Sequence, residues 1–431
     1  MWSWLPPAPP PDALSFDKPY ATQQGDDMTK QLRMLAPESF REQLSRRAFI
    51  QGGTAAAGFA VLLLACGSDD SVGDATPGGE AATGDYSRVV NKASGSLAMY
   101  TWGDYNDPDI VGALAESELG VTMKVDYYPS NEDLITKLAA SAGGSGFDIV
   151  VPTGPYVPQM IEKGLIQKLD MSLIPNLGNL DAAYVSQAWD PNNEYSVCKN
   201  WGSTGFFYDK TKITRKMETW QDFIDACMNE GSGNCAMIDT APNLCGMWYW
   251  SQGKNWNSQD AADLDACEKF LVDEFAQHIK AFDSYPSTKL AEGAYILSMG
   301  WNGDLRQAYT RIADAGGNPE NWVWVLGTPA TELWMDTYCV AAGAPNPEAA
   351  HAWINWLLVP EISIKDLQYH GYNTGMKNID SLITELAPDL EYGDMIFFSP
   401  EQVATFQTQE ITPTLDRMVD IMNKVKAKAG A

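Results

Sequence analysis

The chain has 431 residues, of which 45% are hydrophobic and 11% aromatic, so it can bury one or two cores and is not of the disordered class. Its formal net charge of −27 disfavours nucleic acids and anionic lipid surfaces as partners, because both repel an acidic protein. The three histidines, His278, His351 and His370, lie in no paired spacing, so the sequence predicts neither a histidine-based catalytic centre nor a metal site.

The N-terminal region has the pattern of an export signal. A twin-arginine stretch at 45–50 is followed by an uncharged apolar run at 55–65 that is too short to span a bilayer. The run ends at Cys66 in a sequence that resembles the bacterial lipobox, in which the cysteine is lipidated. We therefore expect export by the twin-arginine route and a lipid-anchored protein in the periplasm or on the outer face of the cytoplasmic membrane. A buried apolar helix with an incidental cysteine is the alternative.

Residues 1–66 thus form an N-terminal extension that carries a lipoprotein signal. The part before Met28 resembles no targeting segment, which makes Met28 a candidate for the true start. Residues 67–96 are rich in Gly, Asp, Ser and Thr and nearly free of large apolar side chains. Such a segment cannot bury enough surface to fold, so the sequence predicts a flexible tether there.

The remaining cysteines fit an oxidising compartment. Apart from Cys66 their number is even, which favours disulfides in an exported protein. The candidate pairs are Cys227 with Cys235, which flank a glycine-rich turn, Cys245 with Cys267, and Cys198 with Cys339, and the connectivity stays open. No C-x-x-C spacing occurs, so a cysteine metal site is disfavoured.

After the tether, strands and helices alternate. Residues 97–102 form a short apolar strand, and an Asp-Pro pair at 107–108 opens a helix. Residues 121–128 form the next strand, and Ser130 begins a helix with capping-box spacing. Residues 147–152 form a third strand, of the kind buried in parallel sheets. This order predicts an open α/β sheet.

Ligands of open α/β sheets bind beyond the carboxyl ends of the strands, which makes 102–105 and 153–156 candidate site segments. The glycines at 143–146 precede a strand instead of following one, so they do not form a phosphate cradle. Residues 104–109 lack the glycine of a calcium loop. The sequence therefore predicts no cofactor.

The second half of the chain repeats the alternation. Helix caps stand at 219–222 and 346–348, and apolar strands lie near 296–301 and 332–340. A second α/β unit fits this pattern.

Several segments match a known family in order and with suitable spacing. They are YTWGDY at 100–105, FDIVVPT at 147–153, WDPNNEYS at 189–196, WNG at 301–303 and WMD at 334–336. Together they resemble the bacterial spermidine/putrescine-binding proteins of ABC importers, and the likeness covers nearly all of the chain from Gly95 onward.

The resemblance implies a two-domain α/β fold of the type II periplasmic-binding-protein kind. Each domain is an open sheet flanked by helices, crossing strands join the domains, and the ligand lies in the cleft between them. By the same likeness, domain one comprises 97–202 and 336–380, and domain two comprises 203–335 and 381–431.

The resemblance also implies the ligand-binding residues. They are Trp102, Tyr105, Trp301, Trp334 and Tyr372 as an aromatic box, Asp336 as the amine-binding carboxylate, and Thr153, Ser284 and Gln407 as polar contacts. These residue types suit a polyamine, because aromatic faces attract ammonium groups by about 0.5–2 kcal/mol per contact and a carboxylate adds a charge-assisted hydrogen bond. For Trp220, Trp353 and Trp356, on helix faces, core packing is the preferred interpretation.

The chain departs from the family pattern in the second domain. A further pair of family carboxylates aligns with Thr240 and Asn243, which carry no charge. A distal ammonium would then be buried without a partner unless Asp239 or Asp304 supplies one, or unless the ligand has fewer charges than spermidine.

A second departure lies after the third strand. There a family tyrosine aligns with Pro155, and the adjacent Tyr156 is the candidate contact in its place. Asp104, within the first aromatic segment, is also a candidate contact.

The sequence therefore predicts a monomeric, extracytoplasmic solute-binding lipoprotein that delivers putrescine or spermidine to the permease of an ABC importer and is not an enzyme. A receptor for another small solute, such as a sugar, an opine-like compound or an amino-acid derivative, is the second hypothesis. An extracellular hydrolase that uses two carboxylates is the third, although no acidic pair stands at a catalytic motif.

Overall fold

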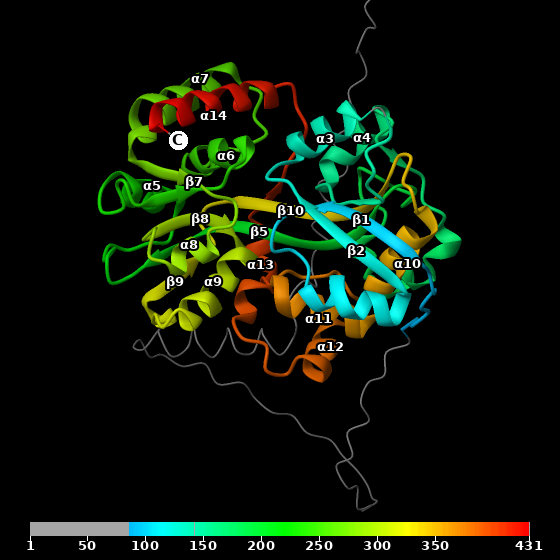
Figure 1. Cartoon of the computed structure of the whole chain (residues 1–431). Helices are drawn as coiled ribbons and strands as arrows, with labels where there is room; N and C mark the ends of the chain where they lie inside the picture. The colour runs from blue at the N-terminus through cyan, green and yellow to red at the C-terminus, as the bar shows by residue number, and fades with distance from the viewer. Residues whose placement is uncertain (1–85, 142, 431) are drawn as a thin grey trace, which may run out of the picture.

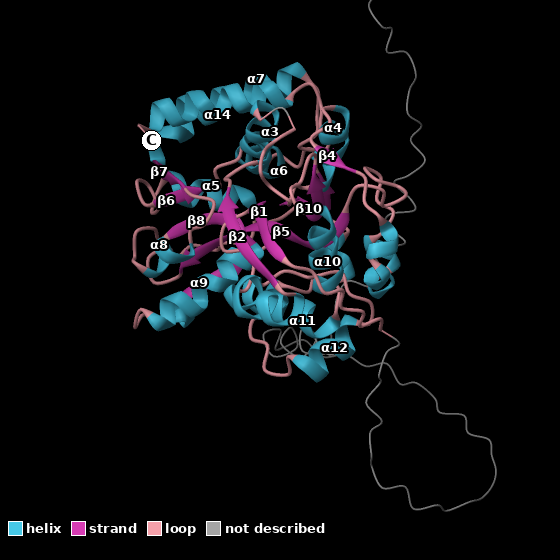
Figure 2. Cartoon of the chain, turned by 45° about the vertical axis from the view of Figure 1, so that its right-hand side comes forward, coloured by secondary structure: helices cyan, strands magenta, loops and turns pink. Residues whose placement is uncertain are grey.

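The computed structural model describes residues 86–141 and 143–430, so the candidate start at Met28, the export signal and Cys66 lie outside the described residues. None of the helices in the described part combines the length and hydropathy that a transmembrane span requires. The fold is of the predicted α/β class, with helices packed around a curled mixed sheet (Figures 1 and 2).

The strands are β1 (Gly95–Thr101), β2 (Val121–Tyr127), β3 (Ile149–Val150), β4 (Ile166–Gln167), β5 (Val197–Asp209), β6 (Cys235–Met237), β7 (Ile279–Phe282), β8 (Leu297–Trp301), β9 (Trp322–Val325), β10 (Thr331–Ala341) and β11 (Phe406–Thr408). Their order across the sheet is β2-β1-β3-β10-β5-β8-β6-β7, with β4 and β11 on β10 and β9 on β5. The first strands pair in parallel, as the predicted βαβαβ order requires.

The α-helices are α3 (Asn131–Ala140), α4 (Val157–Glu162), α5 (Trp220–Met228), α6 (Ala241–Ser251), α7 (Ala261–Lys269), α8 (Ser287–Ala291), α9 (Asn302–Asp314), α10 (Pro347–Leu357), α11 (Pro360–His370), α12 (Ile379–Leu386), α13 (Pro400–Val403) and α14 (Leu415–Ala429). A further helical segment, η2 (Ile110–Leu119), follows the Asp-Pro pair. The predicted caps are confirmed at α3, where Ser130 accepts from the Asp133 N–H at 3.1 Å, and at α5, where Thr219 and Asp222 form a capping box.

The long strands β5 and β10 run through the centre of the molecule. They pair with each other in antiparallel fashion, and β10 then continues along β3 and β4 while β5 continues along β8 and β9. Each strand therefore passes from one half of the molecule into the other (Figure 1).

The buried apolar side chains form separate clusters on the two sides of these strands. The first cluster lies around β1, β3 and helices α10 to α12, and we call this half the first lobe. The other clusters lie around β6, β8 and helices α5 to α9 and α14, and we call this half the second lobe. Leu382, Ile396 and Val403, which the sequence assigns to domain two, belong to the first cluster. The domain boundaries themselves stay a prediction.

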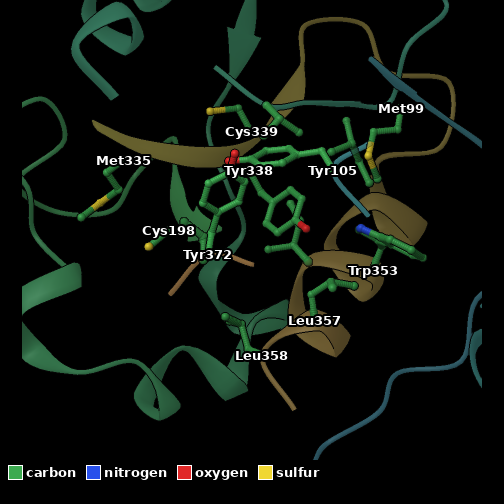
Figure 3. Close-up of a cluster of buried hydrophobic side chains, with 14 of the residues drawn as sticks. Met99, Tyr105, Cys198, Met335, Tyr338, Cys339, Trp353, Leu357, Leu358 and Tyr372 are labelled. Atoms are coloured by element: carbon green, nitrogen blue, oxygen red, sulfur yellow. The ribbon is translucent and has the colours of Figure 1, made fainter. Parts of the chain in front are cut away.

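The tryptophans on helix faces pack inside the cores of the two lobes, whereas the tyrosines of the site lie at the edge of the first core. Trp220, Trp353 and Trp356 are fully buried, which confirms that they pack in cores. Tyr105 and Tyr372 lie together with Tyr338 where the first core reaches the central strands (Figure 3).

The segment before β1 is not flexible where the structure describes it. The Ser87 N–H donates to Asn179 Oδ1 at 2.8 Å, and the Val89 N–H donates to Asn176 Oδ1 at 3.1 Å. Both asparagines are buried, so they fix this segment on the first lobe. The tether at 67–96 stays a prediction: residues 86–94 lie against the first lobe, residues 95–96 belong to β1, and residues 67–85 lie outside the described part.

All cysteines of the described body are free thiols, so the predicted disulfides are not formed in this structure. The Cys227 thiol nevertheless contacts that of Cys235, and the Cys267 thiol contacts that of Cys245. These two pairs stay predicted disulfides of the exported protein.

The third predicted pair is not brought together in the same way. Cys198 lies opposite Thr337 in the β5–β10 ladder, and the Cys339 sulfur contacts the Thr337 hydroxyl at 3.7 Å. Both thiols are buried in the first core (Figure 3), and burial raises the pKa of Cys339 to about 12, so neither is a ready nucleophile.

Candidate functional site

A cavity with about 570 Å³ of atom-free space, partly open to solvent, lies where the lobes meet beside β5 and β10. It brings together most of the predicted ligand residues: Trp102, Tyr105, Thr153, Tyr156, Trp301, Asp304, Trp334, Asp336 and Tyr372. Gly103, of the predicted site segment 102–105, lines it as well. Other lining residues were not predicted as ligand contacts: Asn131, Glu132, Thr240, Pro242, Asn243, Tyr285, Glu332 and Gln409. Both lobes contribute, so the cavity depends on how they are joined.

Aromatic rings form the walls. The Trp102 and Trp301 rings lie edge to face with centroids 5.6 Å apart, and the Trp334 and Tyr372 rings do so at 4.8 Å. The Trp102 indole is held by a hydrogen bond from Nε1 to the Val151 carbonyl at 3.1 Å. This hydrogen bond fixes the orientation of the Trp102 ring in the wall.

Gly202 on β5 makes room for the Trp334 ring. A Cβ atom at this glycine would lie 2.5 Å from the indole, closer than real side chains approach. Trp334 lies within β10 and pairs with this glycine across the ladder of β10 and β5.

Asp336 is the carboxylate that the resemblance places against an amine. It is 5% exposed, and Tyr105 donates its hydroxyl to Oδ2 at 2.6 Å. Oδ1 is buried and accepts no hydrogen bond from the described residues, which leaves one acceptor of this carboxylate free toward the cavity. Burial raises the pKa of Asp336 to about 6, against the stabilising hydrogen bonds from Tyr105 and Thr153 and the nearby charge of Lys199.

Asp304 stands at the start of α9 and also lines the cavity. Its carboxylate receives the hydroxyl of Tyr372, and its own N–H donates back to that hydroxyl at 3.2 Å. Burial raises the pKa of Asp304 to about 7. A carboxylate with this environment gains from a cation beside it.

Glu332 is a buried acidic residue that the sequence reasoning missed. Its Oε2 accepts from the Thr204 hydroxyl and from Asn243 Nδ2, both at 2.6 Å. Burial raises the pKa of Glu332 to about 7 despite these donors. Glu132, also missed, lines the cavity and accepts from the Tyr156 hydroxyl at 2.7 Å.

A signal for Glu332 is present in the sequence. Side chains on a strand alternate between its two faces, so Glu332 shares a face with Trp334 and Asp336. Asn131 and Tyr285 have no comparable local signal, because tertiary packing brings them to the cavity. Asn131 donates to the Thr153 hydroxyl at 3.0 Å, and Tyr285 donates to the Tyr128 carbonyl at 2.9 Å.

Two predicted contacts in the second lobe do not line the cavity. Asp239 forms an ion pair with Lys426 of α14, which commits its charge elsewhere. Ser284 accepts from the Asp239 N–H at 3.2 Å and so connects the loop after β7 to the loop after β6.

Gln407 and Asp104 also lie outside the cavity lining. Gln407 accepts from Trp250 Nε1 at 3.3 Å, and Gln409, two residues later, lines the cavity in its place. Asp104 forms an ion pair with Arg311 at 2.9 Å, which joins a loop of the first lobe to α9.

The lining is acidic and aromatic. Within the described chain, the residues that line this cavity include Glu132, Asp304, Glu332 and Asp336 and no lysine or arginine. No group of three or more His, Cys, Asp or Glu side chains in the described residues could hold a metal ion. Buried carboxylates beside aromatic faces favour an organic cation, because such a ligand supplies positive charge and apolar surface together.

Comparisons with known proteins identify the family of the chain. Residues 109–386 match the family described as bacterial extracellular solute-binding protein. The chain is 30% identical over 280 residues to the spermidine/putrescine-binding periplasmic protein of Escherichia coli, a match that covers 65% of this chain and 77% of that protein. It is 29% identical over 332 residues to the putrescine/agmatine-binding protein of Pseudomonas aeruginosa, covering 74% and 88%.

A solved structure supports the fold. A putative spermidine/putrescine ABC transporter protein from Listeria monocytogenes superposes with a TM-score of 0.68 at 24% identity, over 77% of this chain and 98% of that one. That neighbour supports the two-lobed α/β fold that the sequence predicts. With its matched segment spanning more than half of its length, the chain belongs to the bacterial extracellular solute-binding proteins.

Proposed function

We propose that the protein is an extracytoplasmic receptor that binds putrescine or spermidine and presents it to the permease of an ABC importer. One observation carries the proposal: a cavity between the lobes holds buried carboxylates without a lysine or arginine among its lining residues. The relatives named above, whose names state spermidine, putrescine or agmatine as ligands, support the same solute class.

Electrostatics favours a cation over the other solutes considered. Burial raises the pKa of Asp304 and Glu332 to about 7 and that of Asp336 to about 6, so each carboxylate is destabilised as an anion. An ammonium group restores the lost solvation with charge-assisted hydrogen bonds. A sugar brings no positive charge, and an opine or amino acid adds a carboxylate that these groups repel.

The proposed role is a binding role at the outer side of the cytoplasmic membrane. We propose that the twin-arginine stretch directs export and that Cys66 carries the lipid anchor. Labelling with a radioactive fatty acid tests the anchor, since the Cys66→Ala variant should take up no label and should leave the membrane fraction.

A fluorescence titration of the full chain tests the proposed ligand. Putrescine and spermidine should each quench the tryptophan emission in a saturable way, because Trp102, Trp301 and Trp334 line the cavity. Asp336→Asn should weaken both by at least about 30-fold, since it removes the charge partner of a buried ammonium.

The matched control is Asp239→Asn, which removes an aspartate that pairs with Lys426 outside the cavity. It should leave both affinities within about twofold of the parent. Flat titrations with both polyamines would refute the proposed ligand while leaving the solute-binding family unaffected.

A further inference from the structure

Thr240 and Asn243, which align with the family carboxylates, hold the carboxylate of Glu332 in place. The Thr240 hydroxyl donates to Asn243 Oδ1, and Asn243 Nδ2 donates to Glu332 Oε2 at 2.6 Å. Thr204 on β5 donates to the same oxygen at 2.6 Å. The polar groups at the start of α6 therefore orient an acid that comes from another element, β10.

Glu332 meets the geometric requirements of a ligand contact. It is 5% exposed and lines the cavity, and the Trp301 indole lies near enough to lower the pKa of its carboxylate. A carboxylate has about four acceptor positions on its two oxygens, so it can receive an ammonium in addition to these donors. No lysine or arginine lines the cavity with it among the described residues.

The alternatives from the sequence are weaker on the same evidence. The charge of Asp239 is paired with Lys426. The Asp304 carboxylate accepts a hydrogen bond from the Tyr372 hydroxyl. The Tyr372 ring packs on the rings of Trp334 and Tyr105, near Asp336. Asp304 therefore lies beside the first ammonium position, whereas Glu332 lies beside Trp301 and the start of α6.

The spacing on β10 separates the two acids. A strand rises about 3.3 Å per residue, so the Cα atoms of Glu332 and Asp336 are about 13 Å apart, with the Trp334 ring between them on the same face. The negative charge of Asp336 contributes to the raised pKa of Glu332, so the carboxylates are near enough to share one small ligand.

We propose that Glu332 binds the second ammonium group of the solute, at the far side of Trp334 from Asp336, and so selects solutes with two ammonium groups over those with one. This inference rests on the proposed function. In this protein a single acid on β10, held by Thr204 and Asn243, takes the place of the carboxylate pair of the family pattern.

Paired titrations with putrescine and n-butylamine test the inference, because these amines share a four-carbon chain and differ in one ammonium group. Glu332→Gln should weaken putrescine by at least about 30-fold and n-butylamine by less than about threefold. Asp336→Asn should weaken both amines. Glutamine has the shape of glutamate and still accepts from Thr204, and melting curves without ligand verify that the variant is folded.

A second variant shows whether Glu332→Gln weakens binding through the lost charge or through misfolding. Asn243→Asp in the Glu332→Gln background returns a carboxylate to the family position, and it should recover at least about tenfold in putrescine affinity. Equal weakening of both amines by Glu332→Gln, or no weakening of either, would overturn the inference alone. A parent protein that binds neither amine would contradict the proposed function and this inference with it.

Discussion

Asp336, Glu332 and Asp304 show how burial prepares a carboxylate for a cation. Each is 5% exposed, and burial is the main reason that its pKa lies above the usual range. Other charges near them act in both directions: Lys199 lowers the pKa of Asp336, Asp336 raises that of Glu332, and Asp104 and Arg311 oppose each other at Asp304. The ligand-free site is therefore less stable when fully ionised.

The pKa shifts predict a pH-dependent affinity. With pKa values of about 6 for Asp336 and about 7 for Glu332, the folded protein without ligand keeps protons that the unfolded chain loses near pH 4. The stability that these groups contribute is thus present below about pH 4 and is lost as the pH rises towards 7. A bound ammonium favours the ionised form, so putrescine should bind at least about tenfold more tightly at pH 8 than at pH 5.

Calorimetry over this pH range measures the effect and the protons released on binding. Glu332→Gln should reduce the slope of the profile between pH 6 and pH 8, because it removes one of the two lining acids with a pKa of about 7 and leaves Asp304. An affinity that is constant or falls as the pH rises would show that these carboxylates do not meet the ligand's charge.

At the scale of elements, the strands and capped helices were predictable because their signals are local. The Ser130 cap of α3 and the Thr219–Asp222 box of α5 each depend on residues within one turn. The aromatic box was also predictable, since Trp102, Trp301 and Trp334 stand in recognisable segments. Glu332 could have been found from the two-residue period of β10, which places it on the same face as Trp334 and Asp336.

The rest of the site depends on contacts between distant parts of the chain. Nothing near Asp239 in the sequence reveals that Lys426 neutralises it. Nothing near Asp104 reveals that its partner is Arg311. The anchoring of Ser87 on Asn179 was missed for the same reason, because composition alone indicates a tether.

The Asp104–Arg311 ion pair connects the loop after β1 in the first lobe to α9 in the second lobe. The ion pair measures 2.9 Å, and Gln307 Nε2 also donates to the Asp104 carbonyl at 3.2 Å. We expect Arg311→Met to speed putrescine dissociation by about two- to fivefold, because a half-exposed ion pair contributes about 0.2–1 kcal/mol to the closed form.

Stopped-flow fluorescence measures that rate. Lys289→Met is the matched control, since it breaks a surface pair with Glu292 in the same lobe, and it should leave the rate unchanged. If Arg311→Met and Lys289→Met dissociate putrescine at the same rate, the ion pair does not hold the lobes together.

At the scale of the molecule, the same strands build the site and join the lobes. β10 carries Glu332, Trp334 and Asp336 on one face, and with β5 it passes from one lobe to the other (Figure 1). Ligand contacts and lobe arrangement are therefore linked through one strand pair. A permease can recognise the loaded receptor through the arrangement of its lobes without touching the solute.

The most direct test of this account is a crystal structure of the protein grown with putrescine. The account predicts electron density for the diamine along the Trp334 ring, with one nitrogen within hydrogen-bond distance of Asp336 Oδ1 and the other within that distance of Glu332. Density for the diamine outside this cavity, or a nitrogen placed away from both carboxylates, would contradict it.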